Sequence, residues 1–81
     1  MESTNHLTEE EQEELAMEID ARIAQLEGEG FKDIALLSLM VEYAGDYQRL
    51  MSCTRPARRV ELMLRYKGLR KLTSLLAHMG Y

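Results

Sequence analysis

Cys53 is the first candidate for a nucleophile in this chain of 81 residues, because it is the sole cysteine. Arg55 follows two residues later, and a nearby cation together with the start of a helix would lower the thiol pKa. A nucleophilic thiol also needs a base, and neither His6 nor His78 lies near Cys53 in the sequence. A lone cysteine is more often a small apolar side chain that fills space. We therefore assign Cys53 no catalytic role.

The second candidate for chemistry is a row of carboxylates at one-turn spacing, formed by Glu10, Glu14 and Glu18. Acid–base catalysis would need some of them to be buried with separated pKa values. Their place beside a narrow apolar stripe predicts a solvated acidic face instead. The glycines of segment 28–30 lack the lysine and hydroxyl residue of a phosphate loop, and the two histidines are too far apart for a helical metal pair. The sequence thus predicts a non-enzymatic protein without a catalytic, metal or cofactor site.

Charge is distributed very unevenly along the chain, although the net charge is only -4. Residues 1–30 contain ten acids and one base, whereas residues 55–81 contain seven bases and one acid. Such asymmetry indicates an interaction surface. The acidic face is the row of three glutamates named above. The predicted basic face consists of Arg58, Arg59, Arg65, Lys67, Arg70 and Lys71.

Three interpretations of this charge pattern remain open. The two faces could pair within the chain, with each exposed ion pair contributing little stability. They could instead dock on an oppositely charged protein, which would make the chain a small regulatory or adaptor protein. The alternative is a nucleic-acid-binding protein that uses the basic helical segment 55–71. Overall acidity and the lack of aromatic residues between the cations argue against nucleic acid.

Composition indicates the elements that must position these residues. There are 13 Leu and 6 Met against 3 Ile, 2 Val and 4 Thr, a balance that favours helices over strands. We predict an all-α fold, a small three- to four-helix bundle built on an antiparallel helical hairpin. Residues 1–7 are expected to form a flexible leader and residues 8–81 one helical domain. No apolar run is long enough for a membrane span, and we expect a cytoplasmic protein.

The expected helices cover residues 9–27, 32–51 and 55–79. Thr8 with Glu11 has the spacing of a capping box, and the glycines of 28–30 end the first helix. Pro56 fits a first helical turn, with Ser52 or Thr54 as the N-cap. The last segment is either one helix or two short helices divided at Gly68, and the cost of an interior glycine favours division.

The segment 32–51 has an apolar arc of about 200°, more than half of a helix circumference. Two neighbouring helices from the same chain would leave part of this arc uncovered, so we predict self-association as a homodimer. The partner protein of the adaptor stays unidentified. The expected core consists of Leu15, Ile19, Ile23, Leu26, Ile34, Leu37, Met40, Val41, Ala44, Met63, Leu69, Leu72 and Leu76.

Overall fold

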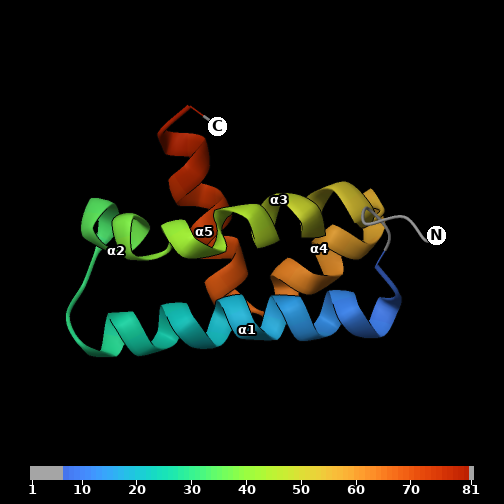
Figure 1. Cartoon of the computed structure of the whole chain (residues 1–81), viewed down its shortest axis with the longest axis horizontal. Coiled ribbons are helices and arrows are strands. Elements are labelled where there is room, and N and C mark those ends of the chain that lie inside the picture. The colour runs from blue at the N-terminus through green and yellow to red at the C-terminus, as the bar shows by residue number, and fades with distance from the viewer. Residues whose placement is uncertain (1–6, 81) are drawn as a thin grey trace.

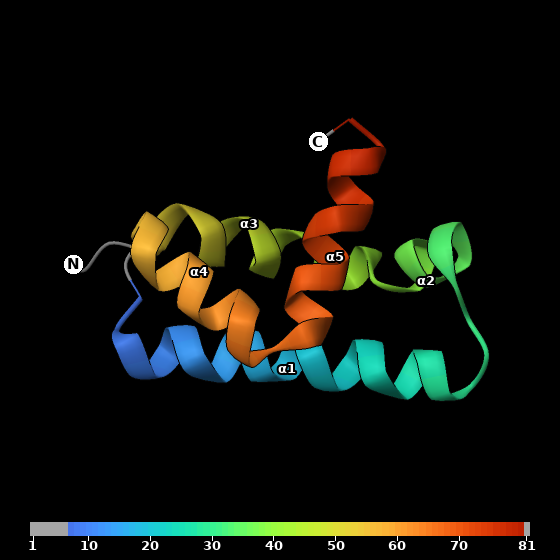
Figure 2. The same ribbon diagram turned by 180° about the vertical axis from the view of Figure 1, so that it is seen from behind.

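A computed structural model describes residues 7–80 and confirms the all-α class (Figure 1). In this part of the chain there are five α-helices, one 3-10 helix and no strand. Helix α1 runs along one edge, and α2, η1 and α3 return along it in the opposite direction (Figure 2). Helix α4 follows, and α5 crosses α1 and projects beyond α2 and α3. The elements are α1 (Glu9–Gly28), α2 (Asp33–Leu39), η1 (Val41–Tyr43), α3 (Ala44–Cys53), α4 (Pro56–Arg65) and α5 (Lys67–His78).

The start of α1 confirms the predicted capping box. Thr8 accepts a hydrogen bond from the Glu11 N–H at 3.1 Å, and the Glu11 carboxylate accepts one from the Thr8 N–H at 2.9 Å. Next to it, the buried Gln12 amide donates to the carbonyl oxygens of Leu7 and Cys53, each at 3.1 Å. Leu7, which we placed in the leader, is only 6% exposed, and the rest of that segment lies outside the described residues.

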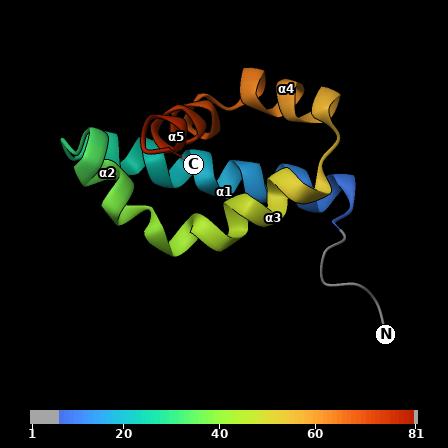
Figure 3. The ribbon, with the colours of Figure 1, turned by 90° about the horizontal axis from the view of Figure 1, so that it is seen from above.

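The prediction of one uninterrupted helix over residues 32–51 is wrong, because the segment is divided into α2, η1 and α3. Near Met40 the bonding pattern tightens, since Met40 N–H reaches the Leu37 oxygen at 3.0 Å and Tyr43 N–H reaches the Met40 oxygen at 2.9 Å. These i to i+3 bonds form η1 and separate α2 from α3. The segment bends as a result, and Figure 3 shows it bowed around the other helices.

The last segment is divided, but at Tyr66 and not at Gly68 as we predicted. Gly68 is buried in the first turn of α5, where α5 touches α1. An added Cβ there would lie 2.7 Å from the Asp20 Cα, and the Gly68 N–H donates to Asp20 Oδ1 at 2.6 Å. Glycine is therefore required for close packing of two helices, and it does not end one.

The connection between α3 and α4 also differs from expectation. Pro56 is the first residue of α4 as predicted, but the N-cap is Arg55, without a side-chain hydrogen bond. The hydroxyl of Ser52 donates backwards to the Gln48 oxygen at 2.8 Å, and that of Thr54 donates to the Leu50 oxygen. The Thr54 hydroxyl thus satisfies one of the last carbonyl groups of α3, which lack helical N–H partners, whereas the Ser52 hydroxyl makes a second bond to a carbonyl inside the helix.

The core lies between α1, the α2–α3 segment and α5. Six predicted core residues are buried, and four more are partly buried against them, whereas three are exposed. The prediction was wrong for those three because the segment 32–51 turns a different edge of its apolar arc inward. Buried as predicted are Ile19, Ile23, Leu26, Met40, Leu69 and Leu72; partly buried are Leu15, Leu37, Met63 and Leu76; exposed are Ile34, Val41 and Ala44; and buried without being predicted are Leu7, Ala16, Leu36, Leu50 and Leu62.

Candidate functional site

The predicted basic face is engaged largely within the chain. Arg58 and Arg65 of α4 form ion pairs with Glu13 of α1, at N–O distances of 3.0 and 2.7 Å. Lys71 of α5 pairs with Glu27 near the other end of α1. The charge asymmetry of the sequence is thus partly neutralised where the acidic first helix meets the basic last two.

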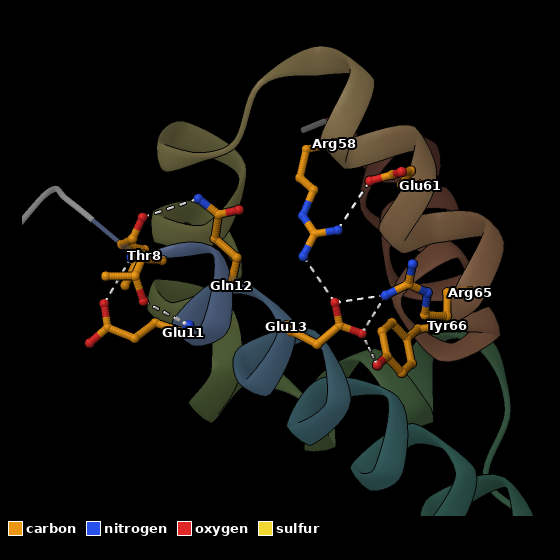
Figure 4. A network of polar contacts seen from close by, with 9 residues as sticks. Thr8, Glu11, Gln12, Glu13, Arg58, Glu61, Arg65 and Tyr66 are labelled. Atoms are coloured by element: carbon orange, nitrogen blue, oxygen red, sulfur yellow. Dashed lines mark hydrogen bonds and ion pairs between the residues drawn. The ribbon is translucent and has the colours of Figure 1, made fainter.

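Glu13 is the centre of this network, which Figure 4 shows from close by. Besides both arginines, its carboxylate accepts a hydrogen bond from the Tyr66 hydroxyl, and Arg58 also reaches Glu61 at 3.0 Å. The Tyr66 hydrogen bond, and then that of Arg65, lower the pKa of Glu13 because they favour its charged form. The same bond raises the pKa of Tyr66, since the phenol keeps the proton that it shares with the carboxylate.

The remaining basic residues are dispersed. Arg59 donates from Nε to the Thr54 oxygen at 3.0 Å, which ties it to the turn before α4. Lys67 and Arg70 are exposed, and their side chains form no hydrogen bond or ion pair within residues 7–80. The six predicted residues therefore do not gather into one open cationic patch, and a phosphate would have to compete with carboxylates for three of them.

The predicted acidic face is exposed as expected. Glu10, Glu14 and Glu18 lie on the outer side of α1, and their side chains have no hydrogen bond or ion pair in the described part of the chain. Solvated carboxylates of this kind carry charge but lack the burial that acid–base chemistry requires. These glutamates contribute a negative electrostatic potential around α1.

A groove that the sequence did not place lies between the α2–α3 segment and α5. Its volume is about 650 Å³, within the range of ligand-binding pockets. Across it, the Tyr47 hydroxyl of α3 donates to Thr73 of α5 at 2.9 Å, so one hydrogen bond joins the two walls. No charged side chain is among the residues that line it, which are Leu37, Met40, Val41, Ala44, Tyr47, Gln48, Met51, Ser52, Leu72, Thr73, Leu76, Ala77 and Met79.

The groove has an origin that the sequence signals in part. Leu37, Val41 and Ala44, which we expected in the core, form one wall together with Met51. The opposite edge of the same apolar arc, with Leu36, Met40 and Leu50, packs inward instead. The sequence signal for this groove was the width of the apolar arc, because an arc wider than the neighbouring helices can cover leaves apolar surface exposed.

Other chemistry has little support in the described residues. Among residues 7–80, no three His, Cys, Asp or Glu side chains lie together as metal ligands would. Over the same range, every helix is too short or too polar to cross a membrane. Cys53 is partly buried, while His6 lies outside the described residues.

Comparison of the chain with protein-family models, with curated protein sequences and with solved structures found no match. Function is therefore inferred from the chain's own geometry, which includes the groove between the α2–α3 segment and α5.

Proposed function

We propose that this protein is a small regulatory or adaptor protein that acts by binding protein, without catalysis, and that the groove is its contact surface. The observation that supports this most is the uncharged lining of an open groove on a chain with 30% charged residues. Apolar surface that stays uncovered, with a polar surround, is typical of protein interfaces.

The residues of the groove suit a protein segment. Met40, Met51 and Met79 are flexible thioether side chains, which recur on surfaces that accept partner helices. The hydrogen bond between Tyr47 and Thr73 holds the walls in place, so little reorganisation is required on binding. Helices commonly dock on such a groove through residues spaced by three or four.

The charged faces have a lesser part in this proposal than the sequence predicted. Half of the basic face is paired with Glu13 and Glu27, while the acidic face of α1 remains available. Charges outside the groove would influence the rate and orientation of association more than its strength. The nucleic-acid alternative has in its favour only dispersed cations without a carboxylate partner, such as Arg55, Lys67 and Arg70, so we rank it second.

Site-specific photo-crosslinking in cells tests the proposal. A photoreactive amino acid at Val41, in the groove, should form adducts with protein. The same amino acid at Val60, an exposed valine on α4, is the matched control and should form far fewer. Equal yields of protein adducts at both positions, or none at Val41, would contradict the proposal.

A further inference from the structure

Helix α4 joins the core through a single buried side chain. Among its ten residues only Leu62 is buried, and Met63 is partly buried against the same core. Two further apolar side chains of α4, Val60 and Leu64, are exposed to solvent. A helix of this length is marginal alone in water, so α4 depends on the few contacts that it makes with the rest of the chain.

The ion pairs of α4 with α1 end on one carboxylate. Arg58 and Arg65 both pair with Glu13, and Tyr66, the residue that follows α4, donates to the same carboxylate (Figure 4). Arg58 lies in the first turn of α4 and Arg65 is its last residue, so Glu13 holds both ends of the helix. The Glu13 side chain is 24% exposed, and water therefore competes for these contacts.

The connections of α4 allow it to leave without moving its neighbours. Thr54 and Arg55 before α4 and Tyr66 after it have extended backbone, so α4 does not continue either neighbouring helix. Ten residues span about 15 Å as a helix and more than twice that length when extended. Unfolding of α4 therefore lengthens the connection between α3 and α5 and pulls on neither of them.

The contacts that hold α5 on α1 do not involve α4. The Gly68 N–H donates to Asp20 of α1, and Leu69 and Leu72 of α5 are buried in the core. The residues that line the groove come from the α2–α3 segment and the α5 end of the chain, and none of them lies on α4. The core between α1, the α2–α3 segment and α5 thus has its own contacts, and so does the groove.

From these observations we infer that α4 detaches from α1 as a unit while the rest of the fold stays closed, and that the Glu13 carboxylate controls this opening. The inference goes beyond the proposed function, because it concerns a part of the chain outside the groove. Opening exposes Leu62, frees Arg65 and leaves Arg58 paired with Glu61 alone. The open state therefore presents a cation and an apolar side chain that the closed state holds inward.

Native-state hydrogen exchange of the purified full chain, followed for single amides by NMR, tests the inference. The amide of Leu62, in the middle of α4, should have a protection factor at least about tenfold below those of Leu69 and Leu72 in α5. Ile23→Val weakens the core about three turns along α1 from Glu13. It should lower the protection of α5 several-fold and leave that of α4 unchanged, because the opening of α4 does not break the core.

The role of Glu13 is tested by two matched pairs of variants. Glu13→Gln should lower the protection of α4 about three- to tenfold, whereas Glu14→Gln, on the exposed side of α1, should leave it unchanged. Tyr66→Phe removes only a hydrogen bond to Glu13 and should lower the protection of α4 to a lesser extent. Tyr47→Phe removes the bond to Thr73 across the groove and should leave the protection of α4 unchanged. Circular dichroism melting of every variant checks that the fold is retained.

Three results would overturn the inference. They are protection of α4 equal to that of α5 in the wild-type chain, an equal loss of protection in α4 and α5 on Ile23→Val, or protection of α4 that Glu13→Gln leaves unchanged. The proposed function is tested separately. Crosslinking at Val41 reports on the groove, which has no residue of α4 in its lining.

Discussion

At the scale of single residues, Gly68 is the described glycine at which an added Cβ would meet close neighbours. Its α-carbon lies against the backbone of Asp20, so a methyl group at 2.7 Å from the Asp20 Cα would force α1 and α5 apart. We expect Gly68→Ala to reduce the free energy of unfolding by about 1–3 kcal/mol, as overpacking does elsewhere. Urea unfolding followed by circular dichroism measures this change.

Gly45 is the control for that experiment. A Cβ there meets nothing within 4 Å, and the residue lies inside α3. Gly45→Ala should stabilise the protein by about 0.5–1 kcal/mol, because alanine loses less backbone entropy in a helix. If both substitutions stabilised the protein equally, the close contact between Gly68 and Asp20 would be refuted.

Residue-scale prediction from the sequence succeeded where the interaction is local. The capping box needs only Thr8 and Glu11, three residues apart, and it formed as predicted. The role of Gly68 could not be predicted, because it depends on a neighbour 48 residues away and on how α1 and α5 cross. From spacing alone the same glycine indicates a helix boundary.

At the scale of elements, α4 is held to the rest of the chain by few apolar contacts and by ion pairs. Among its residues only Leu62 is buried, and its ion pairs to α1 converge on Glu13. Because hydrogen bonds and cations lower the pKa of Glu13, its charged form stabilises the folded chain above the ordinary carboxyl value of 4.5. That contribution is lost as the pH falls from 4.5 towards the lowered folded-state value.

Glu13→Gln should therefore lower the melting temperature at neutral pH, and the difference from the wild-type protein should shrink as the pH falls below 4.5. Melting curves recorded at several pH values check this. Glu14→Gln changes an exposed glutamate without a described partner and should follow the wild-type curve throughout. A constant gap between the Glu13→Gln and wild-type curves across the whole pH range would contradict the role given to this carboxylate.

Element boundaries could be predicted from the sequence only in part. The first helix was placed within one residue at its end, because its cap and its terminal glycines are local signals. The segment 32–51 was predicted as one helix, since no proline lies within it to mark the turn at Met40. The edge of its apolar arc that faces inward depends on α1 and α5, which the sequence does not place.

At the scale of the whole molecule, the acidic first helix and the basic last two partly neutralise one another. We expect no shift of duplex or single-stranded nucleic acid in gels at about 150 mM salt, because three cations of the basic face already pair with carboxylates. The double variant Glu13→Gln and Glu27→Gln releases Arg65 and Lys71, and it leaves Arg58 paired with Glu61 alone. It should bind nucleic acid more tightly than the wild-type chain, with affinity that falls steeply as salt increases.

A wild-type chain that shifts nucleic acid at submicromolar concentration in that salt would make the nucleic-acid alternative the better explanation. The sequence revealed the charge asymmetry but not whether it would be satisfied internally. That depends on α4 and α5 lying against α1, with Arg65 and Glu13 separated by 52 residues in the chain. The groove was unpredictable for the same reason, because its two walls come from separate helices.

The close approach of Asp20 and Gly68 also leads to an expectation for the order in which this chain folds. Helices of 10 to 12 residues such as α4 and α5 are marginal alone in water, whereas α1, with 20 residues and a capping box, is better able to form first. Joining α5 to α1 closes a loop of 48 residues, and the entropy of that closure is lost before the core is gained. We therefore expect α4 and α5 to become stable, and the core to lose contact with water, when α5 packs across α1.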